Sequence, residues 1–251
     1  MLLVPASSAF GLAGTIFKEQ VSPGQELSHK ITVSNEKNAS LVNLTAEIYG
    51  FARNIKGIDI EVPIENDTGT FTARPFLSIE PESFSLGPGE ARTLFLNGTV
   101  PEDIGSGGKY ALVAIKTVPK ASKGVSITTA IHAYVLLTIK DGDLIQTGNI
   151  TALETSKDDN GAKVNLIFEN TGNVHYKPLV EAVLKDGAGK ILAQGEIKKG
   201  PPSYVLPKSS YLFEMTLLPE GGLSSGKYIV EGKVTMEDGT VLDSKETAFE
   251  I

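Results

Sequence analysis

Hydrophobic and polar residues alternate with a period of two along most of the chain, and a helical period is almost absent. Because successive side chains of a strand point to opposite faces of a sheet, this alternation predicts strands with one buried face. In the segment 27–33, for example, Leu27, Ile31 and Val33 fall on one face. Gly, Pro, Asn and Asp interrupt the pattern about every 8–12 residues, which is typical of β-sandwiches. The pattern therefore predicts an all-β chain.

The predicted strands fall into two sets, separated by the polar segment Lys140-Asp-Gly-Asp143. The first set comprises the segments 27–33, 41–49, 91–97, 110–115 and 127–139. The second set comprises the segments 148–153, 163–168, 181–185, 190–193, 210–217, 227–234 and 241–245. We expect two tandem immunoglobulin-like β-sandwiches, at residues 15–140 and 141–251, preceded by a separate segment at residues 1–14.

The two halves of the chain repeat the same turn residues. In each half a strand ends in Asn, a Pro turn precedes a later strand, and a Gly turn leads into a strand that begins with Tyr. The matching pairs are Val33-Ser-Asn35 with Phe168-Glu-Asn170, Leu86-Gly-Pro-Gly89 with Val205-Leu-Pro-Lys208, and Gly108-Lys-Tyr110 with Gly226-Lys-Tyr228. This repetition predicts two sandwiches of similar design.

Several of these strands and turns together carry a family resemblance. They are Val21-Ser-Pro-Gly24, Ile31-Thr-Val-Ser-Asn35, Phe84-Ser-Leu-Gly-Pro-Gly-Glu90 and the stretch 100–111, with Phe168-Glu-Asn-Thr-Gly-Asn-Val-His175 and Val205-Leu-Pro207 in the second half. The chain resembles the immunoglobulin-like prokaryotic surface proteins of the WxL-interacting, pilus-chaperone-like (PapD-like) type. The resemblance covers residues 15–139, and the second half resembles the companion sandwich of such proteins.

This resemblance implies an extracellular scaffold or adhesion role and brings no catalytic residues with it. The chain departs from the family at one point. Members commonly carry a Trp before the Leu-x-Pro-Gly turn, whereas this chain has no Trp and has Phe76-Leu-Ser-Ile79 there. Turn residues of this kind indicate an architecture, and a fold does not by itself determine an activity.

The N-terminal residues allow more than one interpretation. Residues 1–14 begin with a short apolar run and then small residues, like the tail of a signal peptide, but a basic region is missing. They are either such a remnant or a mobile segment. No apolar run reaches the roughly 18 residues of a membrane-spanning helix, so we expect no transmembrane segment in this chain.

The overlapping segment 7–17 is apolar, rich in small residues and suited to a strand. It can form the first strand of its own sandwich. Alternatively, it can add to the open edge of a neighbouring molecule, where Phe10, Leu12 and Ile16 would fill a core and main-chain hydrogen bonds would give affinity. Repetition of that contact would build a filament.

Five Asn-x-Ser/Thr triplets are present, and their asparagines are Asn38, Asn43, Asn66, Asn97 and Asn149. With eleven Asn and roughly 16% Ser plus Thr, chance predicts about 1.7 such triplets. The excess predicts N-glycosylation and therefore an extracellular or cell-surface protein. The chain has no Cys, which is typical of a reducing compartment. The two signals agree in an archaeal surface glycoprotein; the alternative is a cytosolic protein with chance triplets.

The charge of the chain excludes one class of partner. The net charge is −7 and the pI is about 5.1, so there is no basic stripe for phosphate backbones and we expect no nucleic-acid partner. The three histidines, His29, His132 and His175, have no Cys or second His at zinc-ligand spacing. No Gly-x-Ser-x-Gly segment indicates a nucleophile. We expect no enzyme, no catalytic residue, no metal site and no cofactor.

Two further features could bind a ligand. Asp158-Asp-Asn-Gly161 carries oxygen ligands of the kind that Ca²⁺ prefers, but the spacing of an EF-hand loop is missing. Asp141-Gly-Asp143, between the two expected domains, is the better Ca²⁺ candidate, although a solvated turn is the favoured interpretation. Tyr204, Tyr211 and Phe213 could form an aromatic platform for a sugar, or could pack in a core.

The sequence thus predicts a non-catalytic, N-glycosylated structural, spacer or adhesion protein of the cell surface. Its expected partners are other surface proteins or copies of itself, with glycans as a further class. Two alternatives stay open: a subunit of a surface filament assembled through the N-terminal strand, and a carbohydrate- or peptide-binding module of a larger surface protein.

Overall fold

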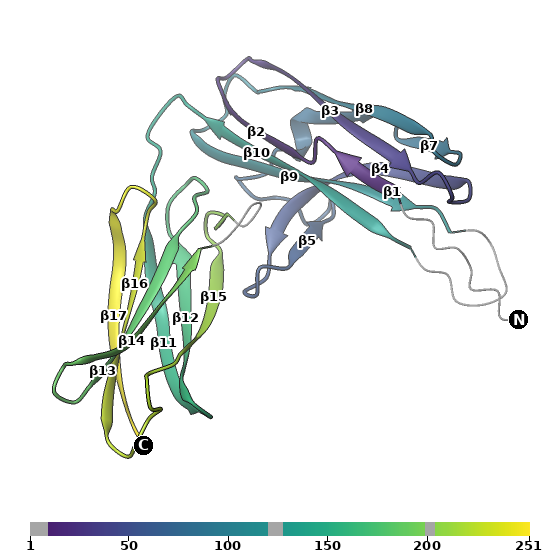
Figure 1. The fold of residues 1–251 in the computed structure, drawn as a ribbon. Coiled ribbons are helices and arrows are strands. Elements are labelled where there is room, and N and C mark those ends of the chain that lie inside the picture. Colours follow the sequence, from purple (N-terminus) through teal and green to yellow (C-terminus); the bar gives the residue numbers. More distant parts are fainter. Residues whose placement is uncertain (1–9, 120–127, 199–203) are drawn as a thin grey trace, which may run out of the picture. The chain divides into compact units, whose positions relative to one another are not determined.

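The computed structural model describes residues 10–119, 128–198 and 204–251, and within them nearly all regular structure is β-strand. Residues 1–9, which fall in the expected signal-peptide remnant or mobile segment, lie outside the described residues. The chain divides into two compact units (Figure 1). One comprises the residues up to Phe51 and Glu61–Asp143, and the other comprises Ala52–Ile60 and Leu144–Ile251. Each unit is an immunoglobulin-like β-sandwich, which confirms the predicted fold class.

The first unit has two sheets that face each other. One sheet has the strand order β1 (Phe10–Ala13), β3 (Glu26–Asn35), β8 (Ala91–Thr99) and β6 (Leu77–Glu80). The other has the order β2 (Ile16–Val21), β10 (Ala130–Ile139), β9 (Gly107–Thr117), β4 (Val42–Arg53) and β5 (Asp59–Val62), with β7 (Ser83–Leu86) also paired to β4. A short 3-10 turn, η1 (Arg74–Phe76), precedes β6.

The first two strands join these two sheets. β1 pairs antiparallel with β3, whereas β2 pairs parallel with β10 in the opposite sheet. The chain crosses between the sheets at Gly14, whose φ of +72° is in the left-handed region that favours glycine. The described part of the segment 7–17 therefore forms the first strands of its own sandwich, and residues 7–9 lie outside the described residues.

The second unit repeats the two-sheet design. One sheet has the order β11 (Gly148–Asp158), β12 (Gly161–Asn170) and β15 (Ser210–Leu217). The other has the order β14 (Ile191–Lys198), β13 (Leu179–Asp186), β16 (Lys227–Thr235) and β17 (Val241–Glu250). The described strands of this unit all pair antiparallel. Within the described residues no helix is long and apolar enough to cross a membrane.

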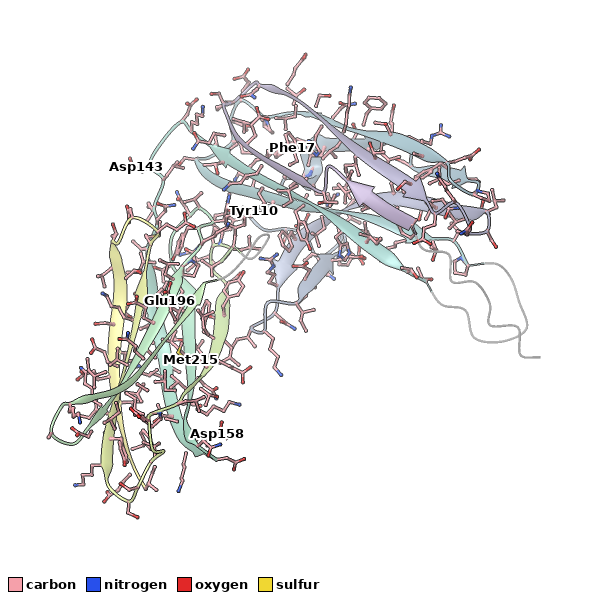
Figure 2. The ribbon with its side chains drawn as sticks, in the orientation of Figure 1. Phe17, Tyr110, Asp143, Asp158, Glu196 and Met215 are labelled. Atoms are coloured by element: carbon pink, nitrogen blue, oxygen red, sulfur yellow. The ribbon has the colours of Figure 1, made fainter. Side chains whose placement is uncertain are left out.

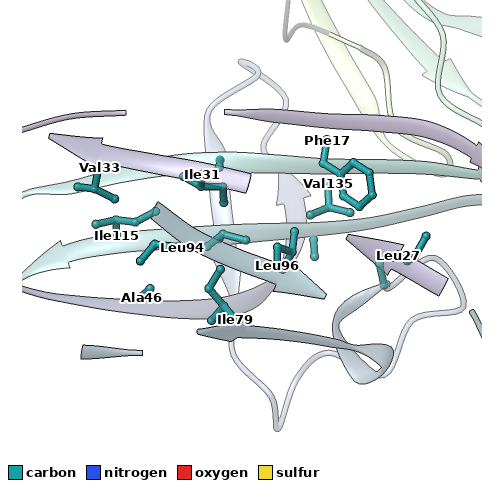
Figure 3. Packing of buried hydrophobic residues seen from close by; sticks show 14 of the residues in the cluster. Phe17, Leu27, Ile31, Val33, Ala46, Ile79, Leu94, Leu96, Ile115 and Val135 are labelled. Atoms are coloured by element: carbon teal, nitrogen blue, oxygen red, sulfur yellow. The ribbon is translucent and has the colours of Figure 1, made fainter. Parts of the chain in front are cut away.

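Each unit encloses its own hydrophobic core. Figure 3 shows that Ile31, Leu94, Ile115 and Val135 project from the two sheets of the first unit toward the same interior. Phe168, Leu166, Leu184, Phe213 and Val230 belong to the separate core of the second unit. Burying a side chain of this size stabilises the folded state by about 1.5–3 kcal/mol, so each core can hold its unit together without a disulfide.

Candidate functional site

A buried asparagine ends β3 and ties together parts of the first unit that are distant in sequence. Asn35 Nδ2 donates to the backbone carbonyls of Ser40 at 2.9 Å, Leu86 at 3.2 Å and Gly87 at 3.1 Å. These acceptors lie in the turn after β3 and at the end of β7. Because buried carbonyls need a donor, this amide holds the turn and β7 together.

Asn170 has the same role in the second unit, at the end of β12. We call each of these asparagine-bonded turns a corner. Asn170 Nδ2 donates to the carbonyls of Val174 and Val205, each at 3.0 Å, and Asn170 Oδ1 accepts from the Gly172 amide at 2.9 Å. The structure thus brings together Asn170 and Val205, as it does Asn35 and Leu86. The repeated turn residues of the sequence are therefore repeated structural corners.

A polar network lies on the sheet of the first unit that contains β4, β9 and β10. Lys116 Nζ contacts Glu61 Oε2 at 2.5 Å and donates to Tyr49 Oη at 3.0 Å. His132 Nε2 donates to the other carboxylate oxygen of Glu61 at 2.8 Å. The ammonium of Lys116 also lies 4.2 Å from the centre of the Tyr49 ring, and Tyr49 Oη donates to Glu47. Glu61 of β5 is thereby fixed to two central strands.

The environment of this network changes the pKa of three groups. Burial opposes ionisation of Glu61, but hydrogen bonds from His132 and Lys116 outweigh it and lower the pKa of Glu61. Burial likewise opposes the charge on Lys116, and its bonds to Glu61 and Tyr49 reverse that effect and raise the pKa of Lys116. Burial, together with the bond to Glu47, raises the pKa of Tyr49. Glu61 and Lys116 are therefore kept as an ion pair at neutral pH.

The asparagines of the five glycosylation triplets all reach the surface. Asn38 and Asn66 are exposed in turns, and Asn43 and Asn149 are exposed on strands β4 and β11. Asn97, on β8, is half-buried, and its Oδ1 accepts from Ser28 Oγ at 3.0 Å. A glycan is attached through the amide nitrogen, so this bond through the oxygen does not occupy the reacting atom.

The structure does not bring the three histidines together. The His29 ring stacks on Phe17 at 4.7 Å between centroids. His132 belongs to the network with Glu61. His175 is buried in the second unit, with its ring 4.9 Å from that of Tyr204.

The candidate aromatic platform is not exposed as a platform. Tyr211 and Phe213 are only 1% and 2% exposed and belong to the core of the second unit. Tyr204 is half-buried, and Lys177 Nζ lies 5.1 Å from the centre of its ring. The core-packing interpretation of Tyr211 and Phe213 is therefore the correct one.

The acidic turns show no cation site. Asp158 lies at the turn between β11 and β12 (Figure 2), where its Oδ1 accepts from the Asp159 amide at 2.8 Å. Asp141 and Asp143 are exposed. Among the described residues no group of three or more His, Cys, Asp or Glu side chains could hold a metal ion.

No family model and no curated protein matches the chain, but solved structures do. The class 5 fimbriae chaperone CfaA matches with a TM-score of 0.45 and 16% identity over 96% of this chain and 98% of that chain. A chain of the Salmonella enterica complex of the SafA pilin with the SafB chaperone matches with a TM-score of 0.43 and 14% identity over 96% of both chains. The E. coli chaperone DraB matches with a TM-score of 0.40 and 16% identity over 97% of this chain and 98% of that chain.

These matches agree with the pilus-chaperone-like part of the resemblance, and they give no support to the WxL-interacting part. Their TM-scores are below 0.5 and their identities below 25%. They describe a likeness in fold alone and carry no argument about what this chain binds.

Sequence reasoning missed the network around Glu61. Lys116 follows Glu61 by 55 residues in the sequence, and His132 follows Glu61 by 71 residues. No local spacing connects them, and β5 is only four residues long. The one signal available was a lone His within the longest predicted strand.

Proposed function

We propose that the chain is a non-catalytic protein of the cell surface or extracellular space, which acts as a structural, spacer or adhesion module and carries N-glycans. One observation carries this proposal: all five triplet asparagines have surface positions, four of them exposed and one half-buried. A glycan needs such a position because it is bulky and solvated. Asn38, Asn43, Asn66 and Asn97 belong to the first unit, so contact surfaces for other proteins are expected mainly elsewhere.

The repeated corner of the two units supports a structural role. Asn35 and Asn170 each make three hydrogen bonds that join a turn to a segment distant in the sequence. Two units stabilised in the same way suit a module that has to keep its shape outside the cell. Its partners would be other surface proteins or copies of this chain.

The test is the mass of the protein isolated from the organism that carries its gene. Intact mass and glycopeptide spectra should show carbohydrate on several of the five asparagines. Protein made in a bacterial host without N-glycosylation provides the unmodified reference mass. An unmodified protein recovered from the native cytosol would overturn the proposal.

A surface filament subunit is the second candidate function. The observation that favours it is β1, a four-residue edge strand that begins at Phe10. Electron microscopy of the native cell surface, with antibody labelling, should then show regular filaments that contain this protein. Isolated labelled molecules would favour the spacer or adhesion role.

A further inference from the structure

We propose that β1 is an exchangeable strand, and that β1 of one copy can occupy the β3 edge of a second copy. The inference rests on the proposed structural role and names a partner for it, namely this chain itself. Exchange of an identical element between two copies creates no new type of contact, so it is a low-cost way for copies to associate.

The site for β1 is an edge of β3 with two apolar positions. Phe10 is 6% exposed, and Leu12 is half-buried against the same core, whereas Gly11 and Ala13 face outward. The four residues pair antiparallel with residues 32–35. Because the site is complementary to this strand in one molecule, it is equally complementary to the same strand of another.

Both neighbours of β1 are held independently of it. β3 pairs with β8 over residues 26–34, so its free edge would stay formed if β1 left. β2 pairs with β10 over Ile16–Val21, and Tyr134 N donates to Thr15 O at 2.7 Å. Residues 10–13 can therefore leave this edge while β2 and β3 keep their other pairings.

Gly14 provides the joint between the fixed and the movable part. It has φ +72°, and a methyl group there would overlap the Lys30 carbonyl oxygen. Glycine is thus required in the closed arrangement, and its freedom of rotation allows an open one.

His29 holds this joint in the closed arrangement. Its Nε2 donates to the Gly14 carbonyl at 2.8 Å. Its ring is nearly parallel to that of Phe17, at an angle of 8°. Phe17 is buried in β2, so the imidazole bridges the fixed strand and the joint.

The test uses cross-linking between two different copies. Gly11 lies directly opposite Ser34 in the register of β1 and β3, and a Cβ at Gly11 would lie 3.6 Å from Ser34 Oγ, so cysteines at the two positions would face each other. Folded Gly11→Cys protein is mixed with folded Ser34→Cys protein, incubated and oxidised. The chain has no Cys of its own, so any covalent dimer joins the introduced positions or like positions of two copies. Peptide mapping of the dimer band identifies the 11–34 link.

The matched control replaces Ser34→Cys by Ser28→Cys. Ser28 is also exposed on β3 but lies outside the part that pairs with β1. We expect about tenfold more 11–34 dimer than 11–28 dimer, and a further increase when His29→Ala is added to both partners. An 11–34 yield no higher than the control yield, with and without His29→Ala, would overturn the proposal.

A variant with both changes in one chain separates exchange from misfolding. Gly11→Cys with Ser34→Cys should form an internal disulfide, remain monomeric and unfold like the parent, which shows that the positions are compatible with the fold. Once oxidised, it should no longer donate β1. The glycan masses are measured independently, so failure of exchange leaves the proposed surface location intact.

Discussion

Gly89 and Lys208 adopt the same left-handed backbone conformation at matching corners of the two sandwiches, with φ of +73° and +58°. In each unit the residue after this left-handed position accepts a hydrogen bond from the backbone N–H of the buried asparagine. Asn35 N donates to Glu90 O at 2.8 Å, and Asn170 N donates to Ser209 O at 3.1 Å. The corner therefore requires a left-handed residue. The first unit uses glycine there, whereas the second uses a lysine with a Cβ.

Replacing Lys208 by glycine should stabilise the second unit. The left-handed conformation costs a non-glycine residue about 1–2 kcal/mol, and part of the gain is lost to glycine's greater freedom in the unfolded chain. The change also removes the exposed bond from Lys208 Nζ to Thr171 O. We expect a net gain of about 0.5 kcal/mol in the free energy of unfolding, measured by urea denaturation. Lys208→Ala loses the same amine but keeps the Cβ, so equal stability of the two variants would contradict this explanation.

Removing either corner asparagine should destabilise its own unit. Asn170→Ala leaves two buried carbonyls and one amide without their partner, at a cost of about 3 kcal/mol. Asn35→Ala should cost less, about 2 kcal/mol, because the buried Oδ1 of Asn35 has no hydrogen-bond partner to lose among the residues that the structure describes. Hydrogen exchange with mass spectrometry can assign each loss to peptides of one unit. Asn160→Ala, at an exposed turn, serves as the control, and a uniform effect on both units would refute the local role.

The stability contributed by Glu61 should depend on pH. Its pKa is lowered from 4.5 in the folded state, so between the folded pKa and about pH 4.5 the unfolded chain binds more protons than the folded one. The stabilisation is therefore present above about pH 4.5 and is lost as the pH falls through the folded pKa. Parent and Glu61→Gln should differ by about 1 kcal/mol at pH 7 and converge in acid, as measured by thermal unfolding. Glu154→Gln makes the same charge change at an exposed site; a constant difference for Glu61→Gln across the pH range would rule out this origin.

Gly108 should tolerate no side chain. A methyl group there would overlap the hydroxyl and ring of Tyr110, which is 2% exposed. Because neither the strand nor the buried ring can move freely, we expect Gly108→Ala to cost more than about 2 kcal/mol, measured as a fall in the urea midpoint. Gly69→Ala is the matched control, since nothing lies within 4 Å of a methyl group at that position. Similar midpoints for the two variants would show that the overlap is relieved.

Alternation of residue types was enough to predict the long strands and their division into two sandwiches. Three short strands, β5, β6 and β7, escaped this reasoning because four residues do not display a clear period. β2 escaped for a different reason: Lys18, Glu19 and Gln20 are all exposed, as is typical of an edge strand that deters pairing with other chains.

The candidate sites depended on facts that sequence spacing does not contain. Tyr211 and Phe213 share one face of a strand, but the pattern does not reveal whether that face meets the core or the solvent. The repeated asparagines were visible as turn residues, whereas their role needed the location of Leu86 and Val205, which lie 51 and 35 residues away. In both cases the three-dimensional structure was needed to show which distant segments lie next to these residues.

Asn43 lies directly opposite Ser85 of β7, and Ser85 Oγ donates to its Oδ1 at 2.7 Å. Among the described residues, β7 pairs only with β4, so no strand covers the row of backbone groups along its other side, although the Leu86 carbonyl at its end accepts from Asn35 Nδ2. A sugar chain on Asn43 would stand beside this row and obstruct the approach of foreign strands. Carbohydrate would then protect β7 from aggregation in the way that charged side chains protect β2, and loss of the Asn43 glycan would show first as reduced solubility.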